Sequence, residues 1–249
     1  MPRIAALRSS LAAACAAAAL AAAGTARAQD AAELLEPIAA ALALERVATL
    51  IVVGSGSGYE PIPADEYAKL AAAAAPDPAR ANDPLYVPPP PPPTRRHYRV
   101  PRETRALDLT SRTLTIERER GEAIERRTVG RDAPWSERHR YWLTPHAFVR
   151  GALAGPAEVS AGEIDGKPHR VVSFTPDDGA EIRGFVDDSD RLVRLQTTIE
   201  AGGPITVETS FLHWEARGGI EFPTTWIRRE NGELAEVLIV REVDARAPR

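Results

Sequence analysis

The sequence predicts a mainly β protein whose largest part is an antiparallel meander. Between His169 and Val243, short segments of alternating apolar and polar residues follow one another, a pattern typical of strands with one buried face. Gly, Asn and Asp separate the segments and supply the positive φ angles of tight hairpins, most clearly at Asn231-Gly232. The expected strands are Arg170–Thr175, Ala180–Val186, Leu192–Ile199, Ile205–Trp214, Phe222–Arg229 and Leu234–Val243.

Residues 1–28 have the pattern of a secretory signal peptide. Arg3 and Arg8 precede a short apolar run, and Ala26-Arg27-Ala28 predicts cleavage before Gln29. The apolar run is too short to cross ~30 Å of hydrocarbon comfortably. We therefore expect a periplasmic or secreted protein with no stable membrane span after cleavage, and a single β-rich domain over 29–249.

Cleavage would leave an acidic chain without cysteine. It removes three of the 31 basic residues and none of the 35 acidic ones, so the formal net charge changes from −4 to −7. Nucleic-acid binding needs a basic excess on one face, so no nucleic-acid partner is expected. Because Cys15, the only cysteine, lies in the predicted leader, burial alone must stabilise the domain.

A short helix and a strand are expected next. Apolar residues recur at helical spacing from Leu34 to Leu42, and Pro37 suits the first position of a helix, which predicts a helix over 37–43. The residues before Pro37 would otherwise be a disordered terminus. A strand is expected at Val47–Val53. The run Gly54-Ser55-Gly56-Ser57-Gly58 lacks the spacing of a phosphate-binding loop and is interpreted as small residues on a strand leading into a loop.

A low-complexity insertion or linker then interrupts the domain, between Pro61 and Arg96. It contains an Ala run and six consecutive prolines, Pro88 to Pro93, which favour an extended polyproline rod. The rod could serve as a stiff surface spacer or as a ligand for an aromatic groove of a partner. Disorder is expected at about 73–94.

Three further strands follow the insertion, after an ordered start at His97–Val100. They are expected at Thr104–Leu109, Arg112–Glu119 and Ala123–Val129. Seven charged residues in this region are interpreted as a solvated face that protects sheet edges: Arg118, Glu119, Arg120, Glu122, Glu125, Arg126 and Arg127.

Thr144-Pro145 and Gly155-Pro156 mark the start and the end of a second short helix, with Thr144 as the capping residue. The side chains expected to face the sheet are Phe148, Ala152 and Leu153. An aromatic cluster should lie close by, formed by Trp135, Tyr141 and Trp142.

The order of these elements carries a resemblance. The chain has, in order, a helix, a strand, charged hairpins, the Thr144-Pro145-His146 helix, and strands ending in Gly219-Ile220-Glu221-Phe222-Pro223 and Glu242-Val243. This order resembles the N-terminal β-rich domain of certain secreted hydrolases of the metallo-β-lactamase superfamily. The architecture is also similar to the half-barrel of the lipoprotein carriers LolA and LolB. The resemblance covers about 37–243 without the insertion. It implies a mainly β (α+β) fold: a curved antiparallel sheet (half-barrel) with two short helices against its concave face.

Catalytic and metal signatures are not found in the sequence. The metal motif of the hydrolase superfamily is missing, the serines lack a Gly-x-Ser-x-Gly elbow, and a cysteine nucleophile is lacking after cleavage. Paired acids such as Asp177-Asp178 sit at expected turns. No metal or cofactor is expected, since the histidines do not pair at ligand spacing: His97, His139, His146, His169 and His213.

Two functions are considered, and the first is a non-catalytic binding module for a lipid-like or other apolar ligand. Its concave face is expected to present Val172, Phe174, Val193, Leu195, Ile199, Val207, Phe211, Trp226, Val237 and Ile239. The proposed ligand-binding side chains are Phe148, Leu153, Phe174, Leu195, Val207, Phe211 and Trp226. The alternative is that these residues simply form a filled core.

The second function is an accessory domain of a metallo-β-lactamase-fold hydrolase system, which would contact another envelope protein through the aromatic cluster. A concave cavity of several hundred Å³ would favour the carrier. A solid core with an exposed aromatic patch would favour the accessory domain.

Overall fold

One antiparallel sheet of 11 strands forms the centre of the molecule in the computed structural model, which describes residues 30–76, 87–177 and 179–248. The strands are β1 (Thr49–Pro61), β2 (Arg95–Asp108), β3 (Thr113–Arg120), β4 (Ala123–Val129), β5 (Glu158–Ile164), β6 (Lys167–Phe174), β7 (Ile182–Val186), β8 (Leu192–Glu200), β9 (Pro204–Arg217), β10 (Ile220–Glu230) and β11 (Glu233–Arg246). The labelled helices are α2 (Ala64–Ala73), α3 (Trp135–Trp142) and α4 (Pro145–Ala154). A further helix, called the N-terminal helix below, covers residues 30–41.

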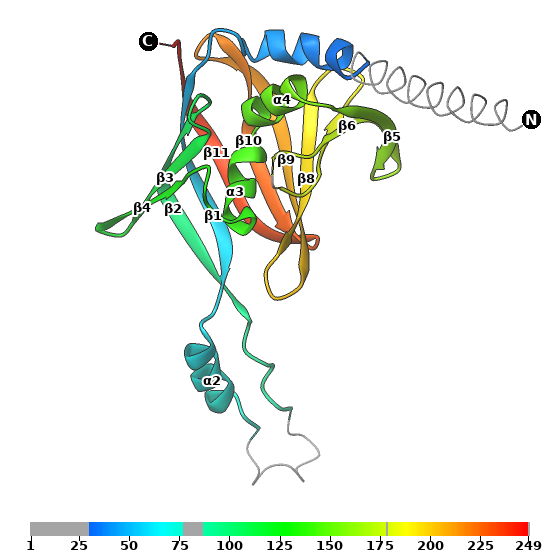
Figure 1. The fold of residues 1–249 in the computed structure, drawn as a ribbon. Coiled ribbons are helices and arrows are strands. Elements are labelled where there is room, and N and C mark those ends of the chain that lie inside the picture. Colours follow the sequence, from blue (N-terminus) through cyan, green and yellow to red (C-terminus); the bar gives the residue numbers. More distant parts are fainter. Residues whose placement is uncertain (1–29, 77–86, 178, 249) are drawn as a thin grey trace, which may run out of the picture.

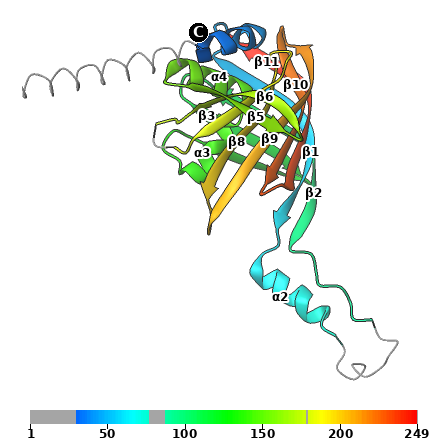
Figure 2. The same ribbon diagram turned by 90° about the vertical axis from the view of Figure 1, so that its right-hand side faces the viewer.

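The sheet is curved and open, with helices on its concave side (Figures 1 and 2). Its strand order is β4-β3-β2-β1-β11-β10-β9-β8-β7-β6-β5. Consecutive strands are therefore neighbours except β4 and β5, which form the two edges, and the first strand, β1, pairs with the last, β11. Helices α3 and α4 lie in the hollow of the sheet, and the N-terminal helix lies across one end (Figure 1). The predicted fold class is confirmed. Among the described helices, none has the length and apolarity needed to span a membrane.

All six strands predicted after His169 are present, as β6 to β11. Strand β5 and helix α3 were not predicted. The strand β5 is an edge strand without a fully buried residue, so its apolar alternation is weak. The helix α3 has the sequence WSERHRYW, whose buried side chains include Arg138 and His139, and charge of this kind normally indicates a solvated segment.

The prediction that Pro37 begins a helix is wrong, because the N-terminal helix already includes residues 30–36. Pro37 lies inside the helix on its exposed side, beside the exposed Glu33 and Glu36. Water can therefore hydrogen-bond to the carbonyl group that loses its intrahelical partner. Packing stabilises the helix despite this loss, since its other side buries three large apolar residues, Leu34, Leu35 and Ile38, and Leu42 directly after the helix is buried as well.

The glycine-rich run lies within β1, which extends well past the predicted end at Val53. A Cβ atom at Gly54 would lie 2.4 Å from the carbonyl oxygen of Ile239, and one at Gly58 would lie 2.5 Å from that of Ala235. Both contacts are with strand β11 and are too short for any side chain. The glycines thus allow β11 to approach β1 closely, and the interpretation of the run as strand is confirmed.

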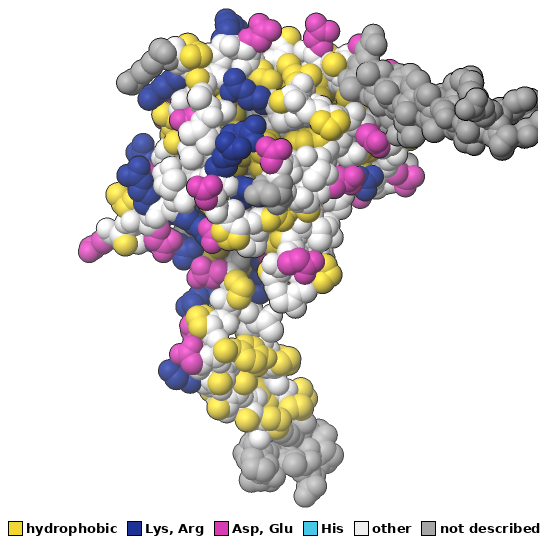
Figure 3. Space-filling model, in the orientation of Figure 1, with side chains coloured by type: hydrophobic (Ala, Val, Ile, Leu, Met, Phe, Trp, Pro, Cys, Tyr) yellow, Lys and Arg dark blue, Asp and Glu magenta, His cyan; other side chains and the backbone are white. Residues whose placement is uncertain are grey.

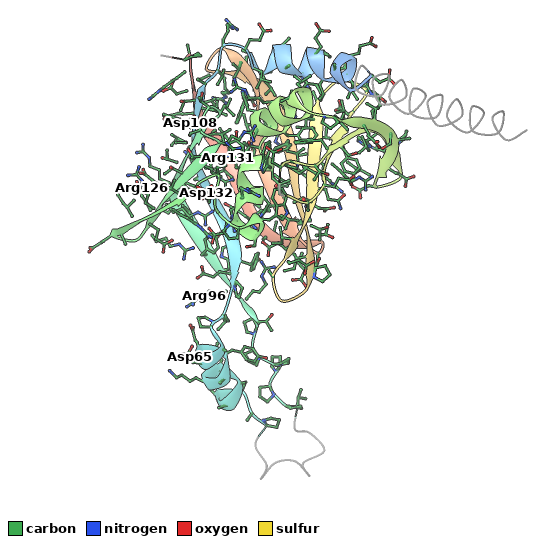
Figure 4. All side chains as sticks on the ribbon, in the orientation of Figure 1. Asp65, Arg96, Asp108, Arg126, Arg131 and Asp132 are labelled. Atoms are coloured by element: carbon green, nitrogen blue, oxygen red, sulfur yellow. The ribbon has the colours of Figure 1, made fainter. Side chains whose placement is uncertain are left out.

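Strands β1 and β2 continue beyond the body of the protein and carry helix α2 on a projecting arm (Figure 1). A backbone hydrogen bond from Ile62 to Thr94 closes the two strands, and Arg96, labelled in Figure 4, pairs with Glu66 of α2 at 3.2 Å. The helix α2 buries no residue and was not predicted, because its Ala-rich sequence was interpreted as linker. The predicted disorder at about 73–94 stays a prediction, since residues 77–86 lie outside the described residues.

The predicted second helix is present as α4, with Pro145 in its first turn. Thr144 occupies the capping position, but its hydroxyl group donates to the carbonyl oxygen of Tyr141 at 2.8 Å and does not cap the helix. Phe148 and Ala152 are buried as expected. The prediction that Leu153 faces the sheet is wrong, because this side chain is 41% exposed and lines a groove beside the N-terminal helix.

The buried face of two strands also differs from the prediction. On β11 the inward side chains are Glu236, Leu238 and Val240, so Val237 and Ile239 point outward. On β8, Leu192 and Leu195 are buried and Val193 is only partly buried, because the register shifts between β7 and β8. A shift of one residue moves a whole strand's side chains to the other face.

Candidate functional site

The apolar part of the concave face contains six of the seven proposed ligand-binding side chains in one buried cluster: Phe148, Phe174, Leu195, Val207, Phe211 and Trp226. Ring centroids are 5.4 Å apart both for Phe148 with Phe174 and for Phe211 with Trp226. Leu153 lies outside this cluster. The six side chains therefore contact one another and the helices, and they fill the concave face in this conformation.

Glycines allow this filling to be tight. A Cβ atom at Gly184 of β7 would lie 2.3 Å from the ring of Phe148, and one at Gly151 of α4 would lie 2.6 Å from Trp142 and 2.7 Å from Phe174. The aromatic rings therefore lie directly on glycine backbone, on both the sheet and the helix. Of the aromatic cluster predicted before α4, Tyr141 and Trp142 are buried, so it does not form an exposed patch.

Helix α3 spans the hollow of the sheet and contacts both of its sides. It packs against β8 on one side and against β3 and β4 on the other. The indole Nε1 of Trp135 donates to the carbonyl oxygen of Thr198 on β8 at 2.9 Å, and Glu137 pairs with Arg127 on β4 at 2.9 Å. Both contacts are exposed, so the first turn of α3 is joined to each side of the sheet by polar contacts at the surface.

The loop before α3 adds one more attachment. This loop includes Arg131 and Asp132, both labelled in Figure 4, and the carbonyl oxygen of Arg131 accepts a hydrogen bond from Arg138 at 2.9 Å. The ring of Trp135 lies on Gly179, where a Cβ atom would be 2.6 Å away. The start of α3 is therefore positioned by loops and side chains, without any strand pairing.

The charged part of the concave face is a buried network, called the arginine–glutamate cluster below, that comprises Glu103, Arg105, Arg118, Arg228 and Glu236. Glu103 accepts from Arg105 Nε at 2.5 Å and from Arg118 Nε at 2.6 Å. Glu236 accepts from Arg105, from Arg118 Nη2 at 2.7 Å and from Arg228 Nε at 3.1 Å. Both carboxylates are nearly inaccessible to solvent, at 2% and 5% exposure.

Each charge in the cluster depends on its partners. Burial acts to raise the pKa of Glu236, but Arg105, Arg228 and Arg118 more than offset this and hold its pKa well below the ordinary value. Burial likewise acts to lower the pKa of Arg105, and the carboxylates of Glu103 and Glu236 raise it instead. Glu236 and Arg105 therefore stay ionised throughout the physiological pH range.

A cavity of about 20 Å³ lies where the charged and apolar parts meet. Its polar lining includes His139 and Arg140 of α3, and its apolar lining includes Trp226, Leu143 and Leu238. Nδ1 of His139 lies 3.2 Å from the carbonyl oxygen of Trp135, an arrangement in which Nδ1 donates and Nε2 is an acceptor. That Nε2 atom is buried without a hydrogen-bond partner within the described part of the chain.

The two cavity side chains have lowered pKa values. Burial, followed by the neighbouring Arg140, lowers the pKa of His139 to about 3. Burial and the positive charges of Arg228, Arg118 and Arg105 lower the pKa of Arg140 to about 10, although Glu236 acts in the opposite direction. His139 is therefore neutral at ordinary pH, and Arg140 is a cation placed among other cations.

This charged site was not predicted from the sequence, because Arg118 and Arg120 were assigned to a solvated face. In the structure the side chain of Arg118 is 16% exposed and lies inside the curved sheet. The sequence does contain a signal, since Leu114, Ile116 and Arg118 alternate along β3 and must share one face. The remainder of the predicted set is exposed or partly exposed, including Arg126 at the edge strand β4 (Figure 4).

An outer groove of about 900 Å³ lies between the N-terminal helix and α4. Its apolar lining includes Leu44 and Leu153, with Arg150 among its charged residues. Figure 3 shows hydrophobic atoms in this region, beneath the N-terminal helix. The groove explains where Leu153 points, and it is separate from the filled concave face.

The described histidines do not form a metal site. No group of three or more His, Cys, Asp or Glu residues that could hold a metal ion occurs within residues 30–76, 87–177 and 179–248. His146 is fully buried instead, and its Nε2 lies 3.1 Å from the carbonyl oxygen of Leu42, joining α4 to the end of the N-terminal helix. Burial lowers the pKa of His146 to about 4, so it is neutral.

Comparison with known proteins gives structural matches only. No family model and no curated protein matches the sequence. A DUF1329 family protein from Desulfovibrio piger matches with a TM-score of 0.45 and 7% identity, over 88% of this chain and 93% of that chain. A LolA superfamily protein from Nitrosomonas europaea matches with a TM-score of 0.41 and 11% identity, over 86% and 94%.

A third solved structure, a putative outer membrane lipoprotein-sorting protein domain from Vibrio parahaemolyticus, matches with a TM-score of 0.41 and 8% identity, over 86% of this chain and 93% of that chain. With values this low, the function has to be argued from the residues of this chain.

Proposed function

We propose that this protein is a non-catalytic, periplasmic or secreted binding module that holds an apolar, lipid-like ligand between the concave face of its sheet and helices α3 and α4. Six side chains would contact the ligand: Phe148, Phe174, Leu195, Val207, Phe211 and Trp226. Leu153 is not included, because it lines the outer groove.

The observation that supports this proposal is the way α3 covers the concave face. The first turn of the helix is joined to the two sides of the sheet by the Trp135–Thr198 and Glu137–Arg127 contacts, both at the surface. An exposed ion pair contributes roughly 0–1 kcal/mol and a hydrogen bond about 1 kcal/mol. Helix α3 can therefore move away from the sheet at a small polar cost, and no strand pairing has to break.

The ligand has to replace contacts that the helices now make. The concave cavity of about 20 Å³ is large enough for one water molecule, whereas ligand pockets usually measure ~300–1,000 Å³. An acyl chain would displace the rings of Trp142 and Phe148, which now pack against Phe174 at centroid distances of 5.8 and 5.4 Å. Burial of the acyl chain itself would offset the weaker packing of the displaced rings.

A crosslink between α3 and the sheet tests the proposal. In a Cys15→Ser background, Arg127→Cys and Glu137→Cys place two thiols where an exposed ion pair now lies, within reach of a short bismaleimide. We expect the crosslinked protein to lose binding of a neutral fluorescent apolar probe, while each single-cysteine variant, treated with the same reagent, keeps it. Equal binding by the crosslinked protein would place the ligand elsewhere, and a wild-type protein that binds no apolar probe would end the carrier hypothesis.

The projecting arm favours a second candidate, an accessory domain that acts through protein contact. Helix α2 buries none of its residues, exposes Leu70, and shows gathered hydrophobic atoms in Figure 3. The aromatic cluster before α4 is buried and cannot form the contact surface that the sequence suggested, so the arm would take this role. A pull-down from envelope extract that depends on α2 and not on the concave face would support this candidate.

A further inference from the structure

We infer that the charged part of the concave face is a subsite for an oxyanion headgroup, a carboxylate or a phosphate, and that Arg140 and Arg228 bind this group. The inference rests on the proposed function for the apolar remainder of the ligand. The ligand would then be an anionic amphiphile with its tail in the apolar part of the concave face.

The positive charges in this region outnumber the negative charges. Arg140 and the three arginines of the arginine–glutamate cluster bring four guanidinium groups together, and the cluster has two buried carboxylates. Glu230, which is partly exposed, accepts a hydrogen bond from Arg228 and adds a third negative charge. One positive charge of the region is left without a matching carboxylate.

The group without a matching carboxylate is Arg140. Within the described residues this side chain forms no ion pair, and its Nε atom is buried without a hydrogen-bond partner. Its nearest charged neighbours include three other arginines, which repel it. A partly buried cation without a counter-charge is costly to a fold, and an oxyanion bound beside Arg140 would supply that counter-charge.

The cavity of about 20 Å³ lies beside Arg140. Its polar lining includes Arg140, Arg228 and His139 together with the carboxylate of Glu236, which is already bound by three arginines, and its apolar lining includes Trp226 and Leu238. A group that fits both linings is charged at one end and apolar next to it. The unpartnered acceptor Nε2 of His139 cannot donate to an anion, but it suits a hydroxyl group or a water molecule bound beside one.

Trp226 joins the two parts of the ligand site. The guanidinium carbon of Arg105 lies 5.4 Å from the ring centroid of Trp226, and the same ring packs against Phe211 and Phe222. The headgroup subsite therefore begins where the apolar cluster ends. The present volume holds one water molecule, so the headgroup enters by the same movement of α3 that admits the tail.

The test measures displacement of N-phenyl-1-naphthylamine, a neutral apolar dye, by dodecanoate, dodecyl phosphate and dodecanol, with the full secreted protein. A charge-assisted hydrogen bond contributes about 1.5–3 kcal/mol, which corresponds to roughly a ten- to hundredfold change in affinity. We therefore expect the anionic ligands to displace the dye roughly ten- to a hundredfold more strongly than dodecanol. The relative strength of dodecanoate and dodecyl phosphate identifies which oxyanion the subsite prefers.

Three variants locate the effect. Arg140→Gln should remove the preference for anions, while Arg140→Lys should keep part of it. Arg150→Gln, in the outer groove, should change neither the preference for anions nor the binding of the dye. Because the subsite is buried, the preference should persist in high salt.

The outcomes separate the two proposals. If dodecanol competes as well as the anions, or if only Arg150→Gln removes the preference, the headgroup subsite is wrong and the apolar binding function stands. If the dye does not bind to the wild-type protein at all, the proposed function fails and the headgroup subsite fails with it.

Discussion

The apolar part and the charged part of the concave face are both buried, but they are held together differently. In the apolar part, rings such as Phe148 and Phe211 touch many neighbours without directional bonds, so a small shift of one ring leaves its other neighbours in place. In the charged part, Glu236 binds three arginines at once, and its removal leaves all three with fewer partners. The apolar part therefore tolerates rearrangement, whereas the charged part keeps one arrangement.

The largest expected effect is in the apolar part. Phe211→Ala should lower the free energy of unfolding by about 3–5 kcal/mol, because the side chain is fully buried and packs on Trp226 at 5.4 Å. Leu212→Ala is the matched control, since this neighbour lies on the other face of β9 and is 40% exposed; we expect less than about 1 kcal/mol. Urea unfolding measures both values. A loss below about 1.5 kcal/mol for Phe211→Ala would mean that the concave face is open in solution.

The next largest effect is expected for a substitution in the charged part. Glu236→Gln should cost about 3 kcal/mol, because the amide keeps one acceptor oxygen but leaves the buried arginines with unbalanced charge. Glu233→Gln on the same strand is the control. Its side chain is 75% exposed and pairs with Arg95 at 3.4 Å, so a change within about 1 kcal/mol is expected in the same unfolding experiment. Equal losses for the two variants would contradict the buried network.

The pH dependence compares the two parts directly, since each contains one buried histidine. His139 and His146 have native pKa values lowered to about 3 and about 4, below the ordinary 6.5. Below pH 6.5 the unfolded chain therefore binds protons that the native protein does not, and stability falls as the pH decreases. By linkage, each histidine should remove about 2 kcal/mol between pH 7.5 and pH 5.

Single substitutions show which histidine causes that loss of stability. His139→Gln and His146→Gln should each flatten the curve of unfolding free energy against pH, and the exposed His97→Gln should leave it unchanged. Arg140→Gln should raise the pKa of His139 and not that of His146, because Arg140 contributes only to the former. Histidine resonances followed by NMR would show a parallel shift of both if this distinction is wrong.

The smallest expected effect lies outside both parts. Replacing residues 63–93 with Asn-Gly should change the free energy of unfolding by less than about 1 kcal/mol, because Ile62 and Thr94 already form a backbone hydrogen bond that a two-residue turn can close. The helix α2 removed in this way buries nothing. Urea unfolding of the shortened protein tests the change, and a loss of several kcal/mol would show that the arm packs against the body.

Much of the sheet could be predicted from sequence, and the reason is visible in β6 to β11. There the apolar alternation and the turn residues agree, as at Asn231-Gly232, where both residues have positive φ angles. The inward face of β11 could not be predicted in the same way, because Leu234–Val243 has apolar residues on both faces. The choice depends on the tertiary contacts of Glu236, which the local sequence does not contain.

The apolar part of the candidate site was predicted as a set of residues, with a filled core left open as the alternative to a binding face, and the sequence could not decide between the two. That depends on the Phe148 ring lying on Gly184, a contact between residues distant in the chain. The charged part was missed because charge was interpreted as exposure. Only Glu103 on β2 and Glu236 on β11 make burial of Arg118 favourable, and no single strand reveals these partners.

The pairing of β1 with β11 determines when the sheet can be completed. These strands are separated by most of the chain, and β11 lies between β1 and β10, so it joins β1–β4 to β5–β10. During synthesis from N- to C-terminus, both groups of strands emerge before the last 14-residue strand does. Until then β1 and β10 each have an unpaired edge, and Glu236 has not yet reached the arginines of the other strands. Final assembly therefore waits for the end of chain synthesis, and a chain that stops before Glu233 would remain as two open sheets.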